Sequence, residues 1–85
     1  MLEDVSEELH KRWGENIRLQ RKIKDKRDEL NGSGIDAMAE ALGVTPETVS
    51  RWETGKLVPR DDRKIAIARY LEVDPRMLFP LVEVS

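Results

Sequence analysis

The sequence contains no cysteine and a single histidine, His10. Disulfide bonds and thiolate metal sites are therefore excluded, and one imidazole cannot build a zinc site on its own. Long apolar runs are also missing, since no stretch approaches the ~20 residues that a membrane-spanning helix needs, and the acidic start does not resemble a signal peptide. We expect a cytoplasmic protein that depends on packing for its stability, binds no metal or cofactor and does not associate with a membrane.

An overall excess of positive charge is lacking too. The 85 residues carry 15 Lys and Arg against 17 Asp and Glu, which gives a net charge of −2 and argues against a surface that coats nucleic acid without discrimination. The charges are unevenly distributed, because acidic residues crowd the first turns and a basic run follows: Arg18, Arg21, Lys22, Lys24, Lys26 and Arg27. Such a run is either a solvated helix face or a surface that meets phosphate groups, and the sequence favours neither.

The apolar fraction of 39% is enough for one modest core in a chain of this length. We therefore expect a single domain over residues 1–80 and a short apolar tail over residues 81–85. The first helix is predicted from about Ser6 to about Leu30, capped by Ser6 or Asp4 and ended by the Asn31-Gly32-Ser33-Gly34 loop. Its apolar face has helical periodicity and comprises Leu2, Val5, Leu9, Trp13, Ile17, Leu19, Ile23 and Leu30.

Two short helices are predicted next. Ser33 with Asp36 resembles a capping box and begins a helix over about 35–42, which Gly43 ends. Thr45 followed by Pro46 is typical of a helix start and begins a helix over about 46–53, which Gly55 ends.

The last part of the chain predicts a longer helix and a final turn. Asp61 or Asp62 is the expected cap of a helix that ends near Glu72, with an inner face of Ile65, Ile67, Ala68 and Leu71. Asp74 and Pro75 begin one further turn over 76–79, which Pro80 stops. The expected fold is all-α, a compact bundle of about five helices.

Two short helices joined by a tight turn with glycine form a helix-turn-helix. The segment MAEALGVTPETVSRWETGKLVP resembles the lambda-repressor and Cro-like (XRE-type) helix-turn-helix family, and IAIARYLEVDPRMLF resembles the closing segment of that family. The resemblance covers about residues 17–79. It implies a sequence-specific transcription regulator, repressor-like, whose partner is double-stranded DNA.

Three features depart from the family pattern. The first helix and its exit loop are longer by roughly two turns, and Ile35 stands where many relatives carry a glutamine that touches phosphate. Lys64 interrupts the apolar stripe of its helix, so it must extend to solvent, pair with Asp61 or reach DNA. Family likeness also implies that Glu53 is structural, tying the end of the second short helix to its neighbours.

Periodicity places Val49 and Trp52 inward and leaves the other face of the 46–53 helix for DNA. Among the base-reading candidates, Arg51 matches the two acceptors of guanine and Glu47 can accept from cytosine, whereas Thr48 can contact a thymine methyl group. Pro46, by resemblance, stands at a base-reading position and offers apolar contact. The open alternatives are that Arg51 binds phosphate or a neighbouring acid, that Glu47 stabilises the helix and that Thr48 packs within it.

A further set of polar residues surrounds this helix and suits phosphate oxygens, which position a protein without reading sequence. These candidates are Thr45, Ser50, Thr54, Lys56 and Arg60, with ordinary solvation as the alternative. The four aromatic residues, Trp13, Trp52, Tyr70 and Phe79, are expected in the core.

No nucleophile, base and orienting group converge in the sequence, so we expect binding and no catalysis. One such domain contacts few base pairs, and a homodimer on a pseudo-palindromic operator, with half-sites about 34 Å apart, is the expected form. The candidate dimer surface is Met77, Leu78, Phe79, Leu81, Val82 and Val84, which alternatively cover the monomer core. Other functions that the fold allows are a protein-interaction module and the DNA-targeting part of an antitoxin or larger repressor.

Overall fold

The computed structural model describes residues 2–80, with side chains from residue 6 onward. Within this range the chain forms five helices and no strand: α1 (Leu2–Arg27), α2 (Gly34–Leu42), α3 (Pro46–Thr54), α4 (Asp61–Leu71) and α5 (Pro75–Leu78). The predicted all-α class is confirmed. None of the helices in residues 2–80 is both long and apolar enough to cross a membrane.

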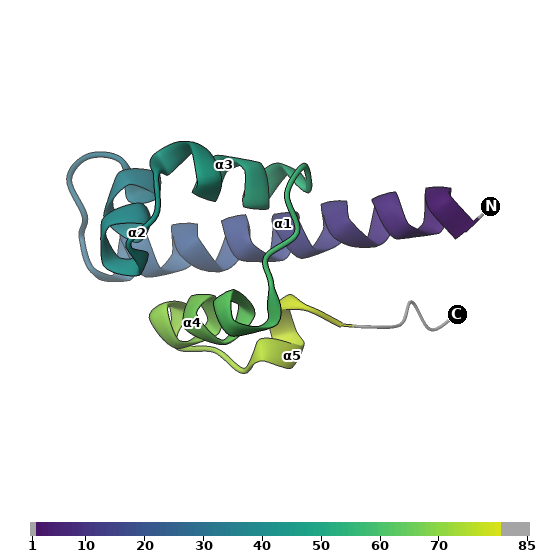
Figure 1. Ribbon diagram of the computed structural model, residues 1–85. Helices are drawn as coiled ribbons and strands as arrows, with labels where there is room; N and C mark the ends of the chain where they lie inside the picture. Colours follow the sequence, from purple (N-terminus) through teal and green to yellow (C-terminus); the bar gives the residue numbers. More distant parts are fainter. Residues whose placement is uncertain (1, 81–85) are drawn as a thin grey trace.

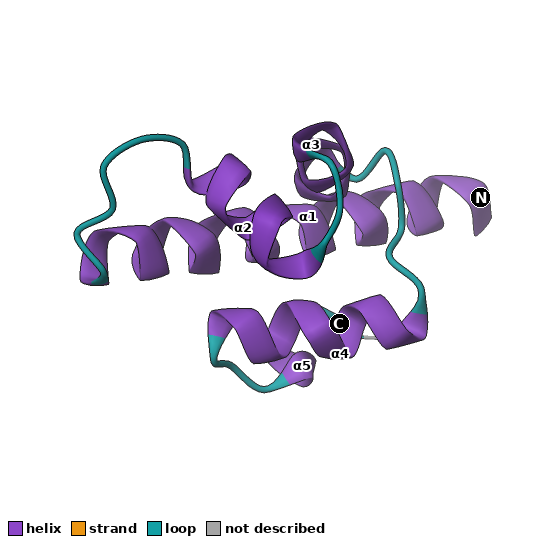
Figure 2. Cartoon of the chain, turned by 60° about the vertical axis from the view of Figure 1, so that its left-hand side comes forward, coloured by secondary structure: helices purple, strands orange, loops and turns teal. Residues whose placement is uncertain are grey.

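Helix α1 is the axis on which the other helices pack. α3 lies on one side of α1 and α4 with α5 on the other, while α2 lies near the carboxyl end of α1 and contacts both α3 and α4 (Figures 1 and 2). The amino-terminal turns of α1 extend beyond the bundle (Figure 1), and the molecule measures 42 × 22 × 20 Å. This arrangement leaves the outer side of α3 clear of the other helices.

The bounds of α1 differ from the prediction at both ends. Ser6 and Asp4 lie inside the helix and do not cap it, because α1 already begins at Leu2. The helix ends at Arg27, three residues earlier than expected, because Glu29 adopts a left-handed conformation with φ of 55°. The Leu30 amide then donates to the carbonyl of Asp25 at 2.9 Å, which closes the helix end as in a Schellman motif.

The capping residues of α2 and α3 were predicted correctly. The Ser33 hydroxyl accepts from the Asp36 amide, and the Thr45 hydroxyl accepts from the Thr48 amide, each at 3.2 Å. Gly43 and Gly55 end the two helices with φ of 70° and 79°. These side-chain caps satisfy amides that the first turn of a helix leaves unpaired, so the helix-turn-helix is defined locally.

The predicted cap of α4 was wrong and that of α5 was right. Arg60 is the residue before α4 and makes no side-chain capping bond, whereas Asp61 and Asp62 lie in the first turn. There their carboxylates are favoured by the positive end of the helix dipole instead. Asp74 caps α5 as expected, accepting from the Arg76 amide at 2.8 Å.

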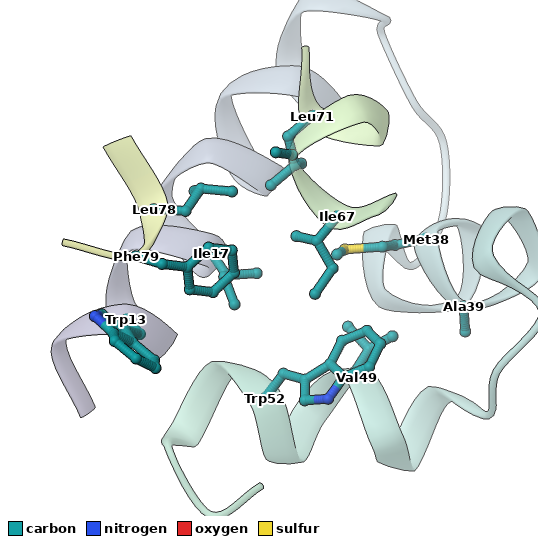
Figure 3. Packing of buried hydrophobic residues seen from close by; sticks show 11 residues of the cluster. Trp13, Ile17, Met38, Ala39, Val49, Trp52, Ile67, Leu71, Leu78 and Phe79 are labelled. Atoms are coloured by element: carbon teal, nitrogen blue, oxygen red, sulfur yellow. The ribbon is translucent and has the colours of Figure 1, made fainter. Parts of the chain in front are cut away.

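The core is one cluster of side chains from all five helices and the residue after α5 (Figure 3). Its buried members are Trp13, Ile17, Met38, Ala39, Val49, Trp52, Ile67, Ala68, Leu71, Leu78 and Phe79. The indole of Trp13 donates to the carbonyl of Pro80 at 2.7 Å and meets the ring of Phe79 edge-on. Tyr70 is only partly buried and packs against the cluster, so three of the four aromatic residues lie in the core as expected.

Several residues predicted to face the core are exposed. Leu19 and Ile23 of α1 expose 58% and 48% of their surface, Leu30 beyond the end of α1 exposes 38%, and Ile65 of α4 exposes 54%. The apolar stripe is wider than the face that the neighbouring helices cover, because α3, α4 and α5 contact only part of it. The side chains of Leu2 and Val5 lie outside the described ones.

The candidate dimer surface needs a correction for the same reason. Leu78 and Phe79 are buried in the core of the monomer, at 0% and 6% exposure, whereas Met77 is 56% exposed. Only Met77 of these three is therefore accessible to a second copy. Leu81, Val82 and Val84 lie outside the described residues.

Candidate nucleic-acid interface

Helix α3 lies unusually close to α1 because glycines stand at the contact. A Cβ added at Gly14 would be 2.6 Å from the carbonyl oxygens of Trp52 and Glu53, and one added at Gly55 would be 2.9 Å from the Cα of Lys11. Both distances are shorter than van der Waals contact allows. Gly14 was not among the predicted residues, although a glycine inside a long helix is a signal of close backbone approach.

A buried ion pair fixes the orientation of α3 on α1. The Arg21 guanidinium donates to both carboxylate oxygens of Glu53, at 2.5 and 3.2 Å, and to Asp25 at 2.8 Å. Arg21 and Glu53 are each 7% exposed, and the hydrogen bond that Arg21 donates to Glu53 raises the pKa of Arg21 above its ordinary value against the opposing effect of burial. The structural role expected for Glu53 is thus present, and its partner is a member of the basic run.

The inward and outward faces of α3 are as the periodicity predicts. Val49 and Trp52 are 0% and 3% exposed, and they point into the core (Figure 3). The lengthened α1 does not cover the opposite side, which we call the α3 outer face; it is formed by the exposed residues Pro46, Glu47, Ser50, Arg51 and Thr54. A shallow hollow on this face is lined by Glu47, Ser50, Arg51, Thr54 and Lys56.

Arg51 and Glu47 are paired with each other on the α3 outer face. The guanidinium donates to the Glu47 carboxylate at 2.8 Å, and the two side chains are 57% and 72% exposed. A solvent-exposed pair of this kind contributes about 0–1 kcal/mol, less than the roughly 1–3 kcal/mol by which a bidentate contact with guanine discriminates. In the structure Arg51 is therefore held in a weak surface pair with a neighbouring acid.

The threonines of this region hydrogen-bond within α3. The hydroxyls of Thr45 and Thr48 lie 2.9 Å apart, and Thr48 is half-buried, facing a hollow that Val44 and Trp52 also line. The Thr54 hydroxyl donates to the carbonyl of Ser50 at 3.1 Å. The packing alternative for Thr48 is thus supported, while its hydroxyl and those of Thr45 and Thr54 keep free lone pairs.

Two predicted phosphate-binding cations flank the ends of α3 and its loop. Lys56 and Arg60 are exposed and form no ion pair with any residue whose side chain is described. Arg63, which sequence reasoning missed, donates to the carbonyl of Leu42 at 2.9 Å and so stabilises the carboxyl end of α2. Nothing in the local sequence around position 63 indicates this contact, because the two residues meet only through the α2–α4 packing.

Two of the three departures from the family pattern, Ile35 and Lys64, pack into the protein. Ile35 is half-buried against the core cluster. The ammonium of Lys64 lies 3.8 Å from Asp61 and 4.3 Å from the centre of the Trp13 ring, so of the three alternatives it takes the pair with Asp61 and adds a cation–π contact. Among the residues with described side chains, no group of three or more His, Asp or Glu is placed to hold a metal ion.

The sequence profile of the helix-turn-helix family matches residues 23–78. Together with the observed fold, this match shows that the chain belongs to the lambda-repressor-like (XRE-type) helix-turn-helix family, which is a family of DNA-binding regulators. Comparisons with curated proteins and with solved structures gave no match.

Proposed function

We propose that the protein is a sequence-specific, repressor-like transcription regulator that reads the major groove with α3. The observation that carries the proposal is the α3 outer face, which the lengthened α1 leaves uncovered and which presents Arg51 between Glu47 and Thr54. In helix-turn-helix proteins the second helix enters the major groove by its amino-terminal residues while the first crosses the backbone. The exposed positions of α3 match that use.

The proposal assigns roles by chemistry. Arg51 exchanges Glu47 for the O6 and N7 acceptors of guanine, and Glu47 is then free to accept from a neighbouring cytosine. Pro46 and the methyl group of Thr48 provide apolar contact to bases. The phosphate contacts come from hydroxyls and cations around the helix: Thr45, Ser50, Thr54, Lys56 and Arg60.

The proposed operator is pseudo-palindromic and is bound by a homodimer. A single α3 reaches only a few base pairs, which is too little to select one site among the many in a genome. Two copies related by a two-fold axis would place their α3 helices in successive major grooves, about 34 Å apart. Equilibrium sedimentation with and without a duplex checks this part of the proposal.

One observation favours a second candidate, a protein-interaction module that keeps the fold without binding an operator. The position of the family's phosphate-touching glutamine is taken by the half-buried Ile35, which has no side-chain donor. Such a module would show no selective, salt-dependent binding to duplexes.

Selection of bound sites from random DNA tests the proposal. The wild-type protein should enrich one motif, and Arg51→Ala should lose preference at a single position, by roughly 1–3 kcal/mol. Lys56→Ala should weaken all sequences alike and lower the salt slope by about one unit. Arg69→Ala is the matched control, since Arg69 is an exposed cation on α4; no enriched motif with the wild-type protein would overturn the proposal.

A further inference from the structure

The basic run of α1 divides into two sets in the folded protein. Arg21, Lys24 and Arg27 are each bound to a carboxylate, respectively of Glu53, Asp28 and Glu72. Arg18, Lys22 and Lys26 are exposed, and none of these three side chains makes a hydrogen bond or ion pair with any residue whose side chain is described. The second set therefore contributes no ion pair to the fold and keeps its donors available for a ligand.

Two members of the unpaired set, Arg18 and Lys22, lie beside the α3 outer face. Arg18 lines one surface hollow together with Ile35 of α2 and with Ser50 and Thr54 of α3. Lys22 follows Arg18 by four residues, so the two side chains are neighbours on the same flank of α1. α1 thus extends the α3 outer face sideways with two cations, past the first turn of α2.

The chemistry of this flank suits a phosphate group. A guanidinium forms two parallel hydrogen bonds to phosphate oxygens, and a nearby ammonium adds a point charge. Ile35, which shares the hollow with Arg18, has no side-chain donor. A DNA strand that passes α2 at this point would otherwise meet an apolar side chain.

We propose that Arg18 and Lys22 of α1 bind the phosphate backbone of the DNA strand that borders the groove occupied by α3. Helix α1 then provides the strand contact that Ile35 cannot make, and the interface extends beyond the helix-turn-helix itself. The inference rests on the proposed function, since it assigns two further residues to the same interface. These residues position the duplex and read no base.

The test compares Arg18→Gln/Lys22→Gln with the wild-type protein by fluorescence anisotropy of labelled duplexes over a salt series. One duplex carries the selected site and one has mixed sequence. For each phosphate that the variant no longer neutralises, the negative slope of log K against log salt should become less steep by about 0.9. Binding should weaken by roughly five- to tenfold at ~0.1 M salt. Both duplexes should be affected alike, and the enriched motif should not change.

Three controls make the result specific. Arg69→Gln removes one positive charge on α4 and should leave the slope unchanged, and Arg18→Lys should keep most of the wild-type slope. Circular dichroism should give equal melting curves for all variants, because Arg18 and Lys22 have no partners within the described part of the fold. If the wild-type protein binds DNA and the double variant has the same slope and affinity, this inference alone is overturned. If the wild-type protein binds no duplex, the proposed function is overturned as well.

Discussion

The cations on the two sides of α1 differ in how many of them are bound to carboxylates. On the side of α4 and α5, Lys24, Arg27 and Arg76 are bound to carboxylates within the described part of the chain. Around α3 the cations are divided: Arg21 and Arg51 are bound to Glu53 and Glu47, whereas Arg18 and Lys56 have no partner among the described side chains. The net charge of −2 therefore says little about DNA binding, because what matters is which cations the protein has already neutralised.

The spacing along α1 explains the division. Arg21, Lys24 and Arg27 are three residues apart: Arg21 meets Glu53 of α3, whereas Lys24 and Arg27 meet Asp28 and Glu72. Arg18 lies beside Ser50 and Thr54 in a hollow that Arg21 also lines, and Lys22 follows Arg18 by four residues on the same face of α1. The basic run is therefore divided into two sets of cations. One set pairs with carboxylates of the protein, and the other set is free for an anion.

The largest effect is expected from breaking the buried ion pair between Arg21 and Glu53. Glu53→Ala leaves the Arg21 guanidinium in the protein interior with Asp25 as its remaining carboxylate partner. Removing one partner of a buried pair costs about 3–5 kcal/mol, so the free energy of unfolding should fall by that amount. Urea denaturation followed by circular dichroism measures it.

The control for this variant replaces both partners. Arg21→Met with Glu53→Leu removes both charges and fills similar volume, so it should recover most of the stability, because apolar replacements of a buried pair are often neutral or stabilising. The same double variant should bind DNA with an unchanged salt slope. A slope lowered by one unit would show that Arg21 contacts phosphate and that the comparison between the two sets is wrong.

The sequence predicted α2 and α3 closely because their ends are set by adjacent residues. Ser33, Thr45 and Gly55 bond to amides and carbonyls within a few positions, so the information is local. The structural role of Glu53 was implied by family likeness. Its partner could not be identified from the residues, because Arg21 lies 32 positions away in the sequence and is one of six similar cations in a run.

The wrong predictions about the apolar stripe of α1 concern which side chains are buried. The apolar stripe of α1 includes Leu19 and Ile23, but which part of a stripe is covered depends on where α4 and α5 pack, and that is a tertiary property. The pair between Arg51 and Glu47 is different, since an acid four residues before an arginine on a helix favours such a contact. The sequence alone does not select this pair over contact with DNA, because the same two side chains suit both.

A smaller effect is expected from Glu47→Gln, which converts Arg51 from a paired to an unpaired cation. The variant removes the 2.8 Å contact and a negative charge from the α3 outer face. Binding to a mixed-sequence duplex should tighten by about two- to fivefold, the scale of a weak surface pair, while preference for one base pair should weaken. Anisotropy titration and repeated site selection measure the two changes.

Glu72→Gln is the matched control for Glu47→Gln. Glu72 also pairs with an arginine, Arg27, but on the α4 side of the molecule, so its replacement should leave DNA affinity unchanged. Equal tightening by both variants would mean that only the net charge matters and would remove the distinction between the two sides.

The smallest expected effect concerns the paired carboxylate Asp74. Hydrogen bonds from the side chain and backbone of Arg76 lower the pKa of Asp74 to about 2, from an ordinary value of 3.8. Because the folded-state pKa is the lower one, the contribution to stability is complete above about pH 4 and is lost as the pH falls through about 2. An NMR titration of the Asp74 carboxyl group should show its midpoint there.

Asp74→Asn separates this charge effect from the capping role, since asparagine also caps helices well. The stability difference between the wild-type protein and the variant should be present at pH 5 and should shrink toward pH 2, while DNA affinity at neutral pH stays the same for both. A midpoint near 3.8 in the folded protein would show that the pair with Arg76 does not form in solution. Arg76 would then be an unpaired cation on the α5 side, and the two sides of α1 would no longer differ in the way proposed.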